Sequence, residues 1–182
     1  MVDNKSLWVY NRILNSKETE HKMATRSTIA LEFADGTIGQ VYCHWDGYLS
    51  NNGKMLQEYY SNPFVLRDLI DLGSLSSLRP QIGTKHPFSM YEAKMTQDEY
   101  ANLYRDMCTF YERDRGEGSA DATYFKDYLH FLVDGQEEEY DYILRNVNGV
   151  ATWFVSDHGG DYMLLTEAFA KEAEAEKEEL PL

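Results

Sequence analysis

Two dipeptides, Asp35-Gly36 and Asn148-Gly149, constrain the fold of this 182-residue chain more strongly than any other feature. Each lies between two runs rich in β-branched and aromatic residues: "STIALEFA" and "TIGQVYCHW" around the first, "EYDYILRNV" and "VATWFVSD" around the second. A two-residue type I′ turn needs positive φ at both central residues, which Asp-Gly and Asn-Gly adopt at low steric cost. The sequence therefore predicts two antiparallel hairpins.

A two-residue turn also fixes which residues face each other across a hairpin. It predicts that Ile29 lies opposite Tyr42 in the first hairpin and that Leu144 lies opposite Trp153 in the second. Strands that are apolar on both faces are expected at the centre of a sheet, covered on each side. The second face of the first hairpin is apolar as well, through Ala30, Val41 and Cys43.

Helical patterns fill most of the chain between the hairpins. Asn62 followed by Pro63 is a typical helix start, and Thr96 with Glu99 three residues later is a capping box. The expected elements are helices at about 50–60, 62–72, 96–107 and 121–133 and a short strand at 107–111. The helix at 121–133 carries Phe125, Tyr128, Leu129 and Leu132 on one side.

These elements predict an α+β fold, with an antiparallel sheet of about five strands built around the two hairpins and helices packed on it. Residues 1–22 read as an N-terminal extension that docks on the body through an apolar face. Residues 23–182 form a single domain, which ends in an acidic helix from about 163 to 179. The apolar face of the extension comprises Leu7, Trp8, Tyr10, Ile13 and Leu14.

The net charge of −14 narrows the range of partners. So negative a surface repels nucleic-acid phosphates, so we expect no direct nucleic-acid binding and favour a protein partner with a basic surface. Cys43 and Cys108 lack metal-ligand spacing and lie in apolar strands, which predicts buried thiols. We expect no cofactor, no membrane span and a cytoplasmic location.

Three sequence blocks stand out together: "ATRSTIALEFADGTIGQVYCHWDGYLSNNGKML", "LIDLGSLSSLRPQIGTKH" and "CTFYERDRGE". They resemble a family of small uncharacterised proteins of bacteriophages, prophages and other mobile elements, and the resemblance runs from Met23 to the early 130s. The resemblance implies a phage or mobile-element protein that acts inside a bacterial host cell. It favours a role in host takeover or in countering anti-phage defence, and it assigns no catalytic residue.

The segment "CHWDGY" supplies the first candidate site. His44 and Asp46 are two apart at a strand end, so their side chains are expected on the same side. Such a pair can act as an acid–base couple or share a metal, and Tyr48 follows closely. The structural alternative is that Asp46-Gly47 forms a turn and that His44 bonds a neighbouring strand.

The charged loop "YERDRGE" supplies the second. Arg113 and Arg115 alternate with acidic residues, among them Asp114, and two such arginines can grip a phosphate or carboxylate. The alternative is a loop that pairs its own charges. Tyr111 and Arg26 are further candidate binding residues, because they flank the expected strand ends.

The loop "SDHGGD" supplies the third. Asp157, His158 and Asp161 could ligate a metal together with His44 or His86, although a plain connection into the last helix explains the same residues. We expect no metal site.

Three functions are consistent with these patterns. The leading hypothesis is a non-enzymatic, phage-type binding protein that engages and inhibits a host protein. An alternative is a protein that binds a nucleotide or nucleotide-like signal, with its base on Tyr48 or Tyr111 and its phosphate on Arg26, Arg113 or Arg115. The last is a small hydrolase or transferase that uses His44 and Asp46. His44, Asp46, Arg113 and Arg115 are expected to lie near one another, around a cleft at the end of the sheet.

Overall fold

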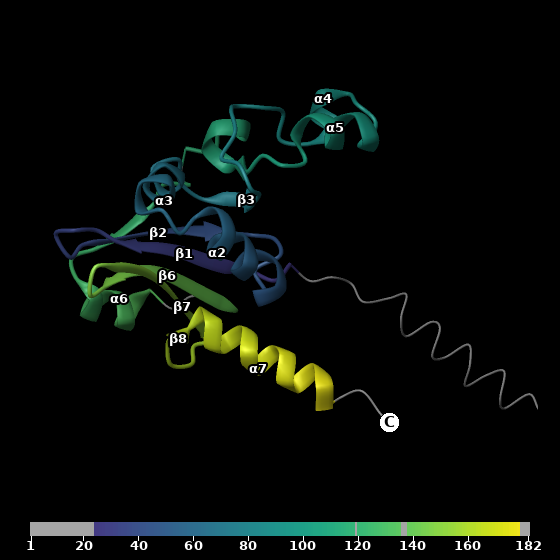
Figure 1. Cartoon of the computed structure of the whole chain (residues 1–182). Coiled ribbons are helices and arrows are strands. Elements are labelled where there is room, and N and C mark those ends of the chain that lie inside the picture. The colour runs from purple at the N-terminus through teal and green to yellow at the C-terminus, as the bar shows by residue number, and fades with distance from the viewer. Residues whose placement is uncertain (1–23, 119, 136–137, 179–182) are drawn as a thin grey trace, which may run out of the picture.

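The computed structural model describes residues 24–118, 120–135 and 138–178. Within them the chain forms an α+β fold around one mixed sheet of eight strands, ordered β4-β3-β2-β1-β6-β7-β8, with β5 also paired to β2 (Figure 1). The strands are β1 Ser27–Glu32, β2 Ile38–Cys43, β3 Leu75–Ser77, β4 Thr109–Phe110, β5 Thr123–Phe125, β6 Tyr140–Val147, β7 Val150–Asp157 and β8 Met163–Leu164.

Some of the helices cover this sheet, and others belong to one projecting lobe. Two π-helical turns, η1 Leu49–Gly53 and η2 Tyr111–Arg115, each follow a strand or the turn after it. The α-helices are α2 Lys54–Tyr59, α3 Pro63–Ile70, α4 Met90–Ala93, α5 Gln97–Tyr104, α6 Tyr128–Asp134 and α7 Leu165–Glu178.

The α+β class is confirmed, but the sheet is larger than expected and is not all antiparallel. The two hairpins lie side by side through their first strands, and β1 runs parallel to β6, with Ile29 paired to Tyr142. A second parallel contact joins β2 to β3 at Cys43 and Leu75. Parallel neighbours need a long crossover, and the hundred or so residues between the hairpins supply it.

The first hairpin exists, but its predicted register is wrong by one residue. Ile29 pairs with Val41 rather than with Tyr42. The loop has three residues rather than two: Phe33 N donates to Thr37 O over 2.8 Å, and only Gly36 within the loop has positive φ. Asp35 Oδ1 accepts from the Thr37 amide over 3.0 Å, which holds the longer loop in place.

The second hairpin is confirmed in both turn and register. Leu144 pairs with Trp153, as expected from a two-residue loop. Asn148 and Gly149 have φ values of 53° and 87°, so both adopt the left-handed conformation that a type I′ turn requires.

The sheet is buried on both faces, because its residues alternate between two cores. Ile29, Val41 and Tyr142 face a core that α2, α3 and α7 close. On the opposite face, Ala30 and Ile143 lie in a smaller core closed by β5 and α6. The central, doubly covered position expected for the first hairpin is therefore confirmed.

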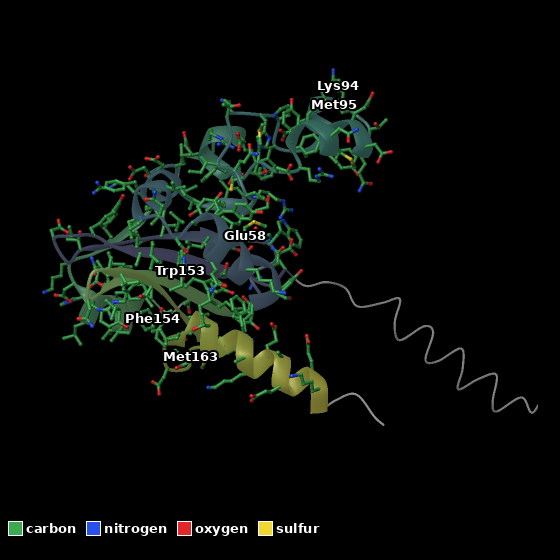
Figure 2. The ribbon with its side chains drawn as sticks, viewed as in Figure 1. Glu58, Lys94, Met95, Trp153, Phe154 and Met163 are labelled. Carbon is green, nitrogen blue, oxygen red and sulfur yellow. The ribbon has the colours of Figure 1, made fainter. Side chains whose placement is uncertain are left out.

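Two predicted helix starts are also confirmed. The Asn62 side chain accepts from Phe64 N at the start of α3, and Thr96 and Glu99 form the reciprocal capping box of α5. Met90–Tyr104, which carries α4 and α5, belongs to a lobe that projects away from the sheet (Figure 1). In Figure 2, Lys94 and Met95 lie at its tip. We call residues 82–107 the α4–α5 lobe.

The expected helix at 121–133 is wrong in its extent. Residues 123–125 form strand β5, and α6 starts only at Tyr128. Phe131 is the buried residue of α6, whereas Leu129 is 68% exposed and Leu132 is 37% exposed. Helical spacing permits either side of this short helix to face the sheet, and the aromatic side does so.

The predicted domain limits can be compared with the structure at the C-terminal end of the chain. Helix α7 extends over most of the predicted acidic helix, after the two-residue strand β8. The predicted extension, residues 1–22, lies outside the described residues. Among the residues that the structure describes, no helix is both long and apolar enough to cross a membrane.

We expect Gly149→Ala to destabilise the protein by about 1–2 kcal/mol, because a Cβ is strained at positive φ. Space is not the cause, since an added Cβ would have no neighbour within 4 Å. Chemical denaturation measures the effect. Gly118→Ala is the control, with its Cβ no closer than 3.8 Å to other atoms and an expected change within about 0.5 kcal/mol. Equal losses in both variants would contradict the turn assignment.

Candidate functional site

The "CHWDG" segment continues β2 and then turns sharply. His44 N donates to Leu75 O over 3.1 Å and Trp45 N donates to Ser76 O over 3.0 Å, so the segment extends the pairing with β3. Asp46 then adopts a φ of 60°, which turns the chain back toward the start of β1. This is the turn that the structural alternative proposes.

Gly47 and Asn52 hold the turn against the body. A Cβ on Gly47 would lie 2.7 Å from the Arg26 carbonyl, so only glycine fits. The buried Tyr142 hydroxyl donates to Gly47 O over 2.8 Å. The buried Asn52 amide donates to Ser27 Oγ, Cys43 Sγ and Trp45 O. These bonds hold the conformation of the segment, whereas the sequence indicates only a helix-capping role for Asn52.

His44 and Asp46 have different partners. His44 Nδ1 lies 2.6 Å from the Tyr42 hydroxyl, and the His44 ring meets Trp45 edge-on at 4.7 Å between centroids. Asp46 instead lies 4.0 Å from Arg79 Nη1 and 3.5 Å from the Tyr48 hydroxyl. The two side chains therefore do not form the acid–base couple that their spacing suggested.

Tyr42 is the centre of a partly open polar face that the sequence analysis missed. Burial raises the pKa of Tyr42 to about 12, and nearby Glu138 and Tyr111 add to the rise, whereas Arg26 lowers it. Of the candidate residues, His44 contacts Tyr42 directly, and Arg26 and Tyr111 act on the Tyr42 phenol through their charges. The available signal was the alternation that places Tyr42 on the same side of β2 as His44.

Arg113 is used inside the fold. Its Nε and Nη2 donate to Asp114, and its remaining N–H groups donate to the carbonyl oxygens of Ile82, Gly83 and Cys108. A guanidinium has five N–H donors, and these five contacts account for all of them. Arg113 is therefore not available to grip a phosphate.

Asp114 completes the same clamp. Its buried carboxylate accepts from His86 N over 3.1 Å and from Phe110 N over 2.8 Å, besides Arg113. Burial alone would raise the pKa of Asp114, but the hydrogen bonds from Arg113, Phe110 and His86 outweigh it and hold the pKa below its usual range. The Arg113–Asp114 clamp joins the two chain segments at the base of the α4–α5 lobe, one before it at Ile82–His86 and one after it at Cys108–Phe110.

The His86 side chain belongs to this clamp rather than to a metal site. It is buried, and its Nε2 and Nδ1 lie 3.1 Å from Cys108 O and 2.9 Å from Pro87 O. Its ring stacks on Tyr104 with 5.0 Å between centroids. Both nitrogens are thus occupied by carbonyl contacts.

The residues at 44–46 and 113–115 do not meet around one cleft. Both segments adjoin β3, but Trp45 bonds Ser76 O while Tyr111 bonds Ser74 O, so they leave in opposite directions. The cause is strand direction, since β4 is antiparallel to β3 whereas β2 is parallel to it. Arg115 is half-exposed, pairs with Glu117 at 3.1 Å and lies over the Phe88 ring.

Asp157 and His158 of the third candidate loop pair with each other. His158 Nδ1 bonds Asp157, and the His158 ring lies 5.8 Å from that of Tyr140. In the part of the chain that the structure describes, no group of three or more His, Cys, Asp or Glu residues could hold a metal ion. Cys43 and Cys108 are buried, and burial raises the pKa of the Cys43 thiol to about 12.

Helix α6 presents an exposed apolar surface. Leu129 and Val133 are 68% and 74% exposed, and Leu132 lies beside them. The other side of α6 is fixed: Phe131 is buried, the Asp127 side chain caps the helix at His130 N, and Arg145 lies 3.5 Å above the Tyr128 ring. We call Leu129, Leu132 and Val133 the α6 ridge. The helical spacing of these residues in the sequence does not show that their side chains are exposed.

Comparisons with known proteins do not extend this picture: no family model, no curated protein and no solved structure matches the chain.

We expect Asp114→Asn to destabilise the protein by about 3–5 kcal/mol, because it leaves the Arg113 charge buried without its partner. The half-exposed Arg115 gives the control: Arg115→Ala should cost no more than about 1 kcal/mol. Denaturant unfolding at neutral pH measures the loss of unfolding free energy in both variants, and equal losses would contradict the role of the clamp.

The clamp also predicts a pH dependence. The folded-state pKa of Asp114 is depressed, so its stabilisation is complete above the unfolded pKa and is lost as the pH falls through the lower folded value. The gap in unfolding free energy between the natural chain and Asp114→Asn should therefore narrow below about pH 4.

Proposed function

We propose that this chain is a non-enzymatic, phage-type binding protein that engages and inhibits a host protein, one active in defence against phage. The observation that carries the proposal is the α6 ridge. Contiguous apolar side chains exposed on a soluble protein mark interaction sites. The resemblance of the sequence to phage proteins supplies the biological context and the cytoplasmic location.

The ridge has the properties of an interface anchor. Its three aliphatic side chains lie on one short helix whose opposite side is held by Phe131 and Tyr128. An anchor on a rigid element loses little conformational freedom on binding, so more of its burial energy appears as affinity. Interfaces of this kind concentrate their energy in a few central apolar residues.

The charge of the chain favours a basic partner. The net charge is −14, and exposed carboxylates line α7 at Glu167, Glu174 and Glu176. Long-range attraction between an acidic surface and a basic one speeds association and is screened over about 8–10 Å at physiological salt. We therefore propose that affinity falls as salt rises, mainly through slower association.

The test begins with tagged protein in host lysate and identification of what it captures. We expect the double variant Leu129→Asp with Val133→Asp to lose the captured protein, with affinity reduced about 100-fold or more, since two anchor contacts are removed. The matched control is Val147→Asp with Val150→Asp, two valines exposed at the hairpin end of β6 and β7. Loss of capture in both variants would contradict the role of the ridge.

Titration of the identified partner separates binding from catalysis. A binder should abolish partner activity near molar equivalence. Complete loss at far lower ratios, removed by His44→Ala, would overturn the proposal in favour of an enzyme.

A second candidate function rests on the open face around Tyr42. Arg26 is half-exposed there, beside Tyr42, His44 and Tyr111, so it can offer a cation to a phosphate next to aromatic rings. If this face holds a nucleotide, a titration with mononucleotides should perturb the His44 ring resonances, and Arg26→Ala should weaken binding about tenfold or more. Arg113→Lys should not weaken it, because Arg113 lies in the clamp. No perturbation of His44 would exclude this candidate.

A further inference from the structure

A groove runs between α7 and the neighbouring edge of the sheet. Its volume is about 300 Å³. The floor is apolar and the rim carries charge, including the carboxylates of Asp157 and Glu172. We call it the α7 groove. Its apolar lining comprises Leu49, Tyr140, Val155, Met163, Ala168 and Ala175.

The groove carries two carboxylates, Asp157 and Glu172, against one cation, Lys171, whose ammonium lies 3.6 Å from Met163 Sδ. Burial raises the pKa of the Tyr140 phenol, and the charges of Asp157 and Glu172 raise it further. The same two carboxylates act in the same direction on Tyr142, deeper in the core. An occupant of matching chemistry therefore presents apolar side chains flanked by basic ones.

The chain enters the fold beside this groove. Tyr140 N, on the groove wall, donates to Arg26 O over 3.3 Å, and Arg26 N donates to Glu139 over 3.1 Å. The 23 residues that precede Ala24 therefore attach next to the groove. Nine of them, 15–23, can span roughly 30 Å when extended, which leaves residues 7–14 free to reach it.

The sequence of this segment matches the groove. Leu7, Trp8 and Leu14 supply apolar side chains, and Lys5 and Arg12 supply positive charge. Residues 1–22 carry four basic and three acidic side chains, in a chain whose overall charge is −14. Tethering also raises the local concentration of the segment, so a modest intrinsic affinity is sufficient for occupancy.

We propose that residues 7–14 of the chain's own N-terminal segment bind in the α7 groove, with Trp8 or a neighbouring apolar residue over Met163 and Ala168. Figure 2 places Met163 beside the start of α7. This inference does not depend on the proposed function, since it concerns a different surface from the α6 ridge.

The test places a photoreactive benzophenone amino acid at position 8 of the full chain. We expect cross-links within one chain to the groove, at Met163, Ala168 or Ala175, identified by mass spectrometry. Cross-links to the α4–α5 lobe or to α6 would overturn the proposal. Links between two chains would overturn it as well, because the occupant would then be a second copy's segment.

A matched pair of variants makes the test specific. Ala175 lines the groove, whereas Ala173 is exposed on the same helix and does not. Ala175→Arg adds bulk and a positive charge to the groove and should lower the cross-link yield about tenfold. Ala173→Arg makes the same chemical change and should leave the yield unchanged. Similar yields in both variants would overturn the proposal even where cross-links form, and thermal unfolding confirms that both variants fold.

Discussion

The parallel pairing of β1 with β6 is the interaction on which the rest of the structure depends. It joins two locally formed hairpins into one sheet and is held by a buried hydrogen bond of 2.6 Å from Thr28 to Asp141 and by an ion pair between Arg145 and Glu32. Both cores are built across this pairing. The Tyr142 hydroxyl, on β6, also holds the turn at Gly47 that follows β2. A polar bond within an apolar pairing fixes register as well as contributing stability, since a shifted register would leave it unmade.

Charged and polar residues that resemble a ligand site in the sequence form hydrogen bonds with backbone groups in the fold. Arg113 and Asp114 satisfy carbonyl and amide groups at the base of the α4–α5 lobe, where two segments of irregular chain meet. Asn52 does the same beneath the turn that carries His44. Irregular backbone buried in a protein needs hydrogen-bond partners, and side chains supply them where no strand or helix can. Residues of the same types would form a ligand site only if their donors were left facing solvent.

The sequence predicts features whose causes are local and fails where the cause is distant. The Asn148-Gly149 turn and the Asn62 cap depend on a few adjacent residues, and both are confirmed. The Asp35-Gly36 loop has the same local signal, yet the side chain of Asp35 bonds Thr37 and favours three residues, which shifts every pair by one. The β1–β6 contact joins residues 113 apart, and no local pattern encodes it. The direction of β4 relative to β2, which separates the two candidate segments, is of the same kind.

The two proposed binding surfaces lie over opposite faces of the central strands. Helix α6 covers the face that carries Ile143, whereas α7 covers the face that carries Tyr142, the adjacent residue on β6. A strand buried on both faces has little freedom to move one side chain without the other, because interiors are close-packed. The close-packed central strands therefore separate the α6 ridge from the α7 groove. A large partner that reaches around the β8 edge would meet both surfaces at once, and it would compete there with the N-terminal segment that we propose for the α7 groove.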